Sequence, residues 1–311
     1  MIDLLRQPSP ARPPRFGGLS DLAPDNAPAA AAEFIQTSSG ERLRYVRGGS
    51  GPDVVLIHGA LVTLEDMLIG PFDALARDFR VVAFDRPGHG LSERGRLQGS
   101  PWIQARMLHD GVTALGLERP VIVGHSFGGA VALAYALLFP EETKGVVALG
   151  PIAFPELRLE QFLLGPRSIP VSGDALAYSL GPVLDTALLP LLWDMMFKPQ
   201  AMPERFRAEF PFPLAGRPEG VQANGDDSIA MIGSMWMAAA SYAACQVPVQ
   251  VMAGSADLVV SPDRHAKPLA FMLPKGSLRM LPGLGHMLHH FAIDEVVEAV
   301  SKAHALGLPT N

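Results

Sequence analysis

The sequence is poor in cysteine and in charge. Of its 311 residues only one is cysteine, and charged residues make up 18% of the chain. A single cysteine, Cys245, excludes an internal disulfide and leaves no second thiol to share a metal. The 25 Lys and Arg residues are thinly spread and the formal net charge is -6, so there is no basic surface for a phosphate backbone. We therefore expect no nucleic-acid partner.

The N-terminal residues do not indicate secretion through a signal peptide. Residues 1–24 carry Arg6, Arg12 and Arg15 among repeated prolines and contain no apolar core of signal-peptide length. Together with the single cysteine, this predicts a cytoplasmic protein. The segment 1–32 reads as a Pro-rich arm. This arm could be disordered, pack on the insertion over 152–227 or embrace a partner subunit. Homo-oligomerisation also stays open.

One uncharged stretch, 228–256, is long enough to raise a membrane-spanning interpretation. Gly233 and Pro248 interrupt it, and its pattern divides into a helix over about 228–244 and a strand over about 247–253. We therefore expect no stable insertion into a membrane.

Apolar residues are abundant: they make up 48% of the chain, enough to build a deep core. After a predicted antiparallel hairpin over 33–48, short continuous apolar runs alternate with helical patterns, as is typical of parallel strands buried on both faces. Strands are expected at 53–57, 81–84, 120–123, 145–149, 247–253 and 277–281, and helices at 72–78, 102–115, 128–139, 262–271 and 293–305. This alternation predicts an α/β fold with a mostly parallel, doubly wound sheet and a ligand site at the carboxyl ends of the strands.

The alternation breaks over 152–227, where Pro, Leu, Phe and Met accumulate, for example in Leu188–Trp193. We expect a helical insertion here, so that the core consists of 33–151 and 228–311. Most of the insertion's apolar side chains are expected to pack against one another, and the remainder would favour an apolar pocket.

The most informative stretch is Gly-x-Ser-x-Gly at 124–128, which lies between an apolar strand and an apolar helix. A nucleophile on such a strand-to-helix turn projects beyond the sheet, and small residues at Gly124 and Gly128 let strand and helix approach closely. The turn also aims backbone N–H groups at the reaction centre. The rival interpretation, a phosphate loop, fails because no Gly-Lys-Ser/Thr follows. Ser126 is therefore the predicted nucleophile.

With this turn in place, the chain resembles the α/β-hydrolase family over roughly 34–305. Four blocks carry the resemblance in the family's order: His58-Gly59-Ala60, Asp85-Arg86-Pro87-Gly88-His89-Gly90-Leu91-Ser92, Gly124-His125-Ser126-Phe127-Gly128-Gly129, and Gly254-Ser255-Ala256-Asp257 with Gly285-His286. The resemblance implies the α/β-hydrolase fold, with an N-terminal antiparallel hairpin and with a helical cap, or lid, in place of the insertion. It implies no cofactor and no metal.

A serine hydroxyl needs a base poised near neutral pH, which among side chains means histidine. The resemblance places this base at His286, after the last strand; His289 and His290 are rivals that we expect to be surface or packing residues. The acid should follow a strand between nucleophile and base, and Asp257 does so, 29 residues before His286. Asp263 is the alternative, although it is better read as part of a helix start after a proline.

The resemblance also assigns the oxyanion hole to the backbone N–H groups of Ala60 and Phe127, with Leu61 as a less favoured second donor. We expect structural roles for His58, for His125 and for the polar side chains of 85–92, His89 included. Those side chains would hold a tight loop to the end of the sheet.

The resemblance implies a serine hydrolase that cleaves a carboxylic ester with an apolar acyl or aromatic portion through an acyl-enzyme; its expected partner is that small-molecule substrate. Epoxide hydrolases and haloalkane dehalogenases of this fold use Asp at the position of Ser126. Carbon-carbon hydrolases of ring-cleavage products share the triad but usually have Asn where this chain has His125. These hydrolases stay open as alternatives, as do a cofactor-free haloperoxidase or perhydrolase, an acyltransferase, and a catalytically silent receptor or scaffold.

Overall fold

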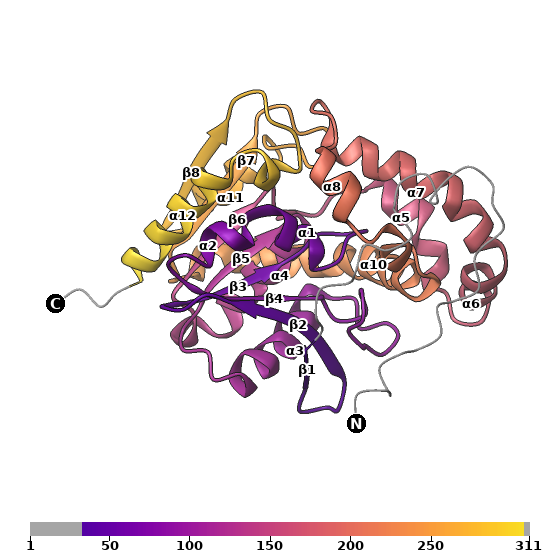
Figure 1. Cartoon of the computed structure of the whole chain (residues 1–311), viewed down its shortest axis with the longest axis horizontal. Coiled ribbons are helices and arrows are strands. Elements are labelled where there is room, and N and C mark those ends of the chain that lie inside the picture. The colour runs from indigo at the N-terminus through magenta and orange to yellow at the C-terminus, as the bar shows by residue number, and fades with distance from the viewer. Residues whose placement is uncertain (1–32, 308–311) are drawn as a thin grey trace.

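The fold is built on one sheet of eight strands. The computed structural model describes residues 33–307, and Figure 1 shows the sheet running through the centre of the molecule. The strands are β1 Glu33–Gln36, β2 Arg42–Gly48, β3 Asp53–Ile57, β4 Arg80–Phe84, β5 Val121–His125, β6 Gly145–Leu149, β7 Val249–Gly254 and β8 Gly276–Leu281. They lie in the order β1-β2-β4-β3-β5-β6-β7-β8. The pairs β1–β2 and β2–β4 are antiparallel and the others parallel, so the predicted α/β fold is confirmed.

Helices cover both faces of the sheet. One face is covered by α3 Pro101–Ala114, α4 Phe127–Leu138, α11 Ala266–Met272 and the second half of α10 Pro218–Ser241. The other face is covered by α1 Glu65–Met67, a π-helical turn at Leu68–Phe72, α2 Asp73–Leu75 and α12 Ile293–Leu306. Within β3, Val55 and Ile57 face the first set and Val54 and Leu56 the second. Burial on both faces is the physical reason why these strands read as continuous apolar runs.

The helix expected over 72–78 is shorter than predicted. Only Asp73–Leu75 is α-helical there, and the π-helical turn precedes it. Gly70 has a non-helical backbone (φ -82°, ψ -117°) and Pro71 has no N–H to donate, so a regular helix cannot run through this segment.

Beyond the carboxyl ends of the strands lies a group of helices that we call the cap (Figure 1). Its helices are α5 Leu159–Leu163, α6 Ser172–Ala175, α7 Gly181–Phe197, α8 Glu204–Glu209, α9 Phe212–Ala215 and the first half of α10. Five large aromatic side chains form the centre of its own core: Trp193, Phe197, Phe206, Phe210 and Phe212. These residues are at most 1% exposed, so they contribute to the stability of the cap and leave few aromatic groups to contact a substrate.

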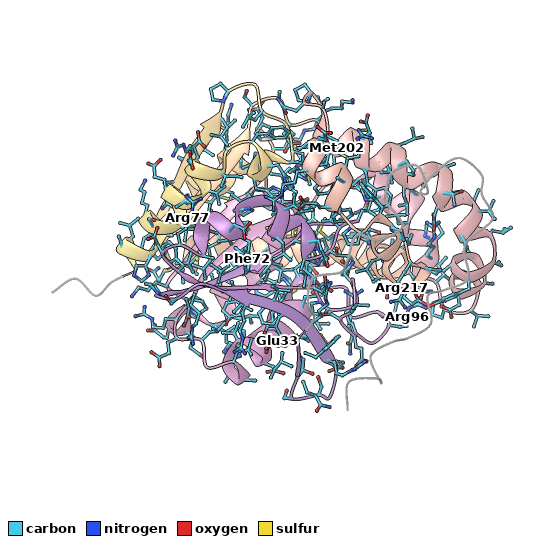
Figure 2. All side chains as sticks on the ribbon, in the orientation of Figure 1. Glu33, Phe72, Arg77, Arg96, Met202 and Arg217 are labelled. Carbon is cyan, nitrogen blue, oxygen red and sulfur yellow. The ribbon has the colours of Figure 1, made fainter. Side chains whose placement is uncertain are left out.

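The long helix α10 joins the cap to the core. A helix was expected over about 228–244, but it begins at Pro218, so the predicted boundary at 227/228 lies inside one continuous helix. Two acidic residues near that boundary, Asp226 and Asp227, interrupt the apolar periodicity, so the sequence does not indicate a helix there. Both side chains are nevertheless buried. Asp227 is bound by Arg86 (2.7 Å) and Arg94 (2.6 Å), and Asp226 by Arg96 (3.3 Å), which lies beside α10 in Figure 2. These ion pairs fix α10 to the loop that follows β4.

One helical stretch, Ser172–Phe197, is long and apolar enough to cross a membrane by length and composition, with a mean hydropathy of 1.5. Only 22% of its apolar window is buried, and a single stretch of this kind is weak evidence for a membrane span. The uncharged stretch 228–256 instead divides into the end of α10 and strand β7, as predicted.

Candidate active site

Ser126 lies on a strained turn between β5 and α4. Its backbone has φ 54° and ψ -114°, a conformation that costs a non-glycine residue about 1–3 kcal/mol. A Cβ at Gly124 would lie 2.1 Å from the carbonyl oxygen of Gly128, and one at Gly128 would lie 2.4 Å from that of Ile57. Only glycine fits at these two positions, which is why the Gly-x-Ser-x-Gly spacing produces this turn. The side chain of Ser126 is thereby placed at the carboxyl end of the sheet.

Asp257 and His286 are brought together at the same edge, after β7 and β8. Asp257 Oδ2 lies 2.8 Å from His286 Nδ1, and both side chains are almost fully buried. Asp257 Oδ1 accepts hydrogen bonds from the backbone N–H groups of Val259 and Val260, at 2.8 Å each. Burial opposes ionisation, but His286 and these two N–H groups outweigh it and lower the pKa of Asp257. The ionised carboxylate can only accept, so Nδ1 of His286 carries the proton and Nε2 is left as a base.

The segment after β6 links Ser126 to this pair. The N–H of Ser126 donates to the carbonyl oxygen of Leu149 at 2.9 Å, and the N–H of Ile152 donates to the carbonyl oxygen of Ser126 at 3.2 Å. Gly150, between them, packs so closely on the pair that an added Cβ would lie 3.3 Å from His286 Nδ1 and 3.5 Å from Asp257 Oδ2. The segment that hydrogen-bonds the backbone of Ser126 therefore also packs on the Asp257–His286 pair. The alternative acid, Asp263, is exposed and pairs with Lys267 on α11.

The loop over residues 58–62, which we call the oxyanion loop, lies against Ser126. A Cβ added at Gly59 would lie 3.3 Å from Cβ of Ser126. The N–H of Phe127, the first residue of α4, has no partner within its own helix, because the first N–H groups of a helix never do. The N–H of Leu61, the less favoured donor, is bound at 2.9 Å by the side-chain oxygen of Asn224 from α10. This contact occupies the N–H of Leu61, and Ala60 and Phe127 stay the predicted donors.

Two histidines of the motif blocks hold loops in place. His58 Nδ1 donates to the carbonyl oxygen of Gly59 at 2.8 Å, and Nε2 accepts from the N–H of Arg86 at 2.9 Å. Burial and the nearby Arg86 hold the pKa of His58 well below its usual value, so the ring is neutral. His125 Nε2 lies 3.1 Å from the backbone oxygen of His286 and thereby ties the turn at Ser126 to the loop that carries His286.

The polar loop after β4 is occupied by its own contacts. Asp85 accepts from Arg44 and from the N–H groups of Leu64 and Leu91, and Ser92 Oγ donates to its backbone oxygen at 2.9 Å. Burial raises the pKa of Asp85 to about 6, although the charge of Arg44 opposes this rise. This arrangement supports the structural role expected for residues 85–92.

His289 and His290 are more deeply engaged than the surface or packing role expected of them. Nε2 of His289 and Nε2 of His290 lie 3.0 and 2.8 Å from the same atom, Oδ1 of Asp66, and all three side chains are buried. Burial, followed by the nearby His289, lowers the pKa of His290 to about 4. Within the described part of the chain, this is the group of His and acidic side chains whose ligand atoms lie close enough, within 4.8 Å, to hold a metal ion. Protons on both Nε2 atoms already satisfy the shared carboxylate oxygen, so the contacts are those of a hydrogen-bonded cluster.

No spacing in the sequence pointed to Asp66 or Asn224 as partners of the site. Asp66 is 223 residues from His289, and Asn224 is 163 residues from Leu61. Contacts over such distances depend on tertiary structure, so only the burial of a charged or amide side chain in a folded chain reveals them.

Comparison with known proteins identifies the family. The model of the alpha/beta hydrolase family matches residues 54–299, a range that includes Ser126, Asp257, His286 and the loop over 58–62. The chain belongs to the alpha/beta hydrolase family. This membership makes it a hydrolase of that fold.

Relatives of this alpha/beta hydrolase are divergent. The chain is 29% identical over 270 residues to an uncharacterized protein of Mycobacterium tuberculosis, covering 82% of this chain and 76% of the relative. It is 28% identical over 260 residues to a 2-hydroxy-6-oxo-6-phenylhexa-2,4-dienoate hydrolase of Burkholderia cepacia, covering 79% and 85%. A thermophilic esterase of Thermogutta terrifontis superposes with a TM-score of 0.70 at 20% identity, covering 89% of this chain and 99% of the esterase, which shows the shared fold.

Proposed function

We propose that this alpha/beta hydrolase is a serine hydrolase that cleaves a carboxylic ester with an apolar acyl or aromatic portion. The observation that carries the proposal is the buried contact of 2.8 Å between Asp257 and His286, next to a strained serine turn. An ionised carboxylate on Nδ1 of an imidazole leaves Nε2 free to take a proton, which is what serine needs to become a nucleophile.

In the proposed reaction, Oγ of Ser126 attacks the ester carbonyl carbon while its proton passes to Nε2 of His286. The backbone N–H groups of Ala60 and Phe127 donate to the oxyanion of the tetrahedral intermediate, and each such donor is typically worth a few kcal/mol. Protonated His286 then gives its proton to the leaving alkoxide oxygen, and the acyl group remains on Ser126. A water molecule, deprotonated by His286, then attacks the acyl-enzyme; as the bond to Oγ breaks, His286 returns this proton to Ser126 and the carboxylic acid is released.

The preference for an apolar substrate rests on what surrounds the site. The cap core includes Leu61 and Val62, next to Ala60, and Met287, next to His286. Apolar side chains therefore surround the loops that would hold the scissile bond, and this apolar setting favours a substrate with an apolar acyl or aromatic group. The substrate is proposed to be a small molecule. A cytoplasmic location fits the buried free thiol of Cys245, which reducing conditions would preserve.

Carbon-carbon bond hydrolysis is the second candidate, because the Burkholderia cepacia relative, matched over 79% of this chain, is named as a dienoate hydrolase. His125 weighs against it, since the hydrolases of ring-cleavage products that the chain resembles usually have Asn there. Loss of the absorbance of a 2-hydroxy-6-oxo-dienoate on incubation with the protein, faster than hydrolysis of any ester tested, would favour this candidate.

A fluorophosphonate probe tests the proposal directly. It should label Ser126 with one equivalent at neutral pH, and the Ser126→Ala variant should not be labelled. A panel of p-nitrophenyl esters of increasing chain length should then show kcat/KM rising with the apolar length of the acyl group. Folded protein that is never labelled near neutral pH would overturn the proposal and favour a catalytically silent member of the fold.

A further inference from the structure

Leu61, the residue after the proposed oxyanion donor Ala60, is held from both sides by the cap. Its backbone has a positive φ of 60°, which is unfavourable for a leucine. Its N–H donates to Oδ1 of Asn224 at 2.9 Å, and its carbonyl oxygen accepts from the indole N–H of Trp193 at 2.8 Å. Both polar groups of this strained residue are thus satisfied by side chains of the cap helices α10 and α7.

The two cap side chains are themselves fixed. Nδ2 of Asn224 donates to the carbonyl oxygen of Gly220 at 2.8 Å, which leaves Oδ1 to face Leu61. The ring of Trp193 packs edge-on against Phe212, with centroids 4.8 Å apart. Both side chains are at least 96% buried, because Asn224 is 4% and Trp193 1% exposed. Neither hydrogen bond therefore has water as a ready substitute.

The anchoring of α10 gives the contact a rigid base. Asp226 and Asp227, directly after Asn224 and Gly225, bind Arg94 and Arg96, and Asp227 also binds Arg86 of the core loop. These ion pairs therefore hold Asn224 in place relative to the core. Through its hydrogen bond to the N–H of Leu61, Asn224 in turn fixes the oxyanion loop.

We propose that Asn224 and Trp193 are positioning residues for the oxyanion hole, holding the peptide that follows Ala60 so that the N–H of Ala60 faces the reacting carbonyl. The inference rests on the proposed function and adds that α7 and α10 complete the site. A strained loop keeps an unfavourable conformation only while its surroundings determine it. Displacement of α7 and α10 would release Leu61, so the oxyanion hole is formed only when the cap is docked.

This role predicts a specific kinetic signature. Loss of an oxyanion donor lowers kcat by about 10²–10³-fold, because the donor acts on the transition state. Asn224→Leu, which keeps the side-chain size and removes the acceptor, should lower kcat by about 10–100-fold and change KM by less than about threefold. Trp193→Phe, which removes only the indole N–H and some ring area, should lower kcat by a smaller factor of about 3–10.

Gln222→Leu is the matched control. Gln222 is on the same helix and 5% exposed, and its amide donates to Asp174 at 2.7 Å and to the backbone of Arg167, with no contact to Leu61. It tests whether loss of any buried hydrogen bond in the cap has the same effect. Its kcat should stay within about twofold of the wild type.

Hydrogen–deuterium exchange of the peptide 58–64 provides a readout that does not depend on activity. The Leu61 amide should exchange at least about tenfold faster in Asn224→Leu than in the wild type and be unchanged in Gln222→Leu. Unchanged exchange in Asn224→Leu, or equal shifts of KM and Tm with unchanged kcat in both leucine variants, would overturn the inference. If Asn224→Leu does not fold, Trp193→Phe decides the same question by kcat and exchange. A wild type that the fluorophosphonate fails to label would refute the proposed function and the catalytic part of the inference, whereas exchange would still decide whether Asn224 holds Leu61.

Discussion

Two buried clusters of aspartate and histidine share the loop that follows β8. They differ in how many imidazole rings the aspartate binds. In the first, Asp257 binds one imidazole, His286, whose other nitrogen is directed away from the carboxylate. In the second, Asp66 binds two imidazoles, His289 and His290, through one oxygen. His286, His289 and His290 all follow β8, so the two clusters share a loop and a chemical composition.

The difference teaches that an aspartate–histidine pair is not a catalytic unit by composition. Asp257 and His286 pack on Gly150, in the segment that hydrogen-bonds Ser126, so a hydroxyl lies at the same edge of the sheet. Asp66 comes from α1, and its two imidazoles pack at tilted or edge-on angles against Phe197, Phe206 and His125. In the proposed function the first cluster serves proton transfer, whereas the second ties the His286 loop to α1.

Replacing Asp257 should have the largest effect on activity. Asp257→Asn keeps the shape but removes the charge that fixes the proton on Nδ1 of His286. Loss of the equivalent charge in triads of this kind lowers kcat by about 10⁴-fold, and we expect a similar loss with p-nitrophenyl esters. The melting temperature should change little by comparison. If the activity of this variant stays within tenfold of the wild type, Asp257 is not the acid that orients His286.

Replacing Asp66 should have the converse effect. Asp66→Ala leaves two buried imidazole N–H groups without an acceptor, so the free energy of unfolding should fall by about 3 kcal/mol. We expect kcat of the folded fraction to stay within about tenfold of the wild type. Denaturant unfolding measures the first quantity and initial rates the second, with Asp66→Asn, which keeps Oδ1, as the milder control. If Asp66→Ala lowers kcat as much as Asp257→Asn does and leaves the stability unchanged, the second cluster takes part in catalysis as the first does.

Sequence reasoning succeeded where the signal was local. The predicted strands match β3 to β8 within a few residues, because strands buried on both faces read as continuous apolar runs. Gly124 and Gly128 surround Ser126 at a spacing that only a tight strand-to-helix turn requires. The positions of Asp257 and His286 followed from the chain order of the family. In each of these cases the physical constraint acts over a few residues, or the family order supplies the rest.

It failed where the constraint was tertiary. Asp66, Trp193 and Asn224 bind partners 223, 132 and 163 residues away, and no periodicity encodes such a contact. The start of α10 was missed for a related reason, since Asp226 and Asp227 break the apolar pattern although arginines bury them. In a sequence, a charged residue that is buried by an ion pair cannot be distinguished from a surface residue, because its partner is not known.

The pH dependence of stability separates His290 from the groups around it. Its folded pKa is about 4, below the usual 6.5, so between these values the unfolded state binds a proton that the folded state does not. Stability from this residue is therefore complete above about pH 6.5 and is lost as the pH falls toward 4, at about 1.4 kcal/mol per pH unit at most. His290→Gln keeps an N–H for Asp66 and should flatten the curve by up to that slope. Denaturant unfolding between pH 4 and 7 measures it. Asp66, His289 and Arg205 all act on the pKa of His290, and an unchanged slope would show that His290 does not gain a proton in this pH range.

The smallest effect is expected at Asp263, the other acid that follows β7. Its side chain is 72% exposed and pairs with Lys267 at 2.5 Å, one turn along the chain, whereas Asp257 is buried against His286. An exposed pair of this kind contributes at most about 1 kcal/mol, so Asp263→Asn should leave kcat within about twofold and the melting temperature almost unchanged. Parallel rates for Asp263→Asn and Asp257→Asn compare two acids of the same type, six positions apart, that differ in burial and partner. A large loss at Asp263 would show that position after the strand, rather than contact with the imidazole, selects the acid.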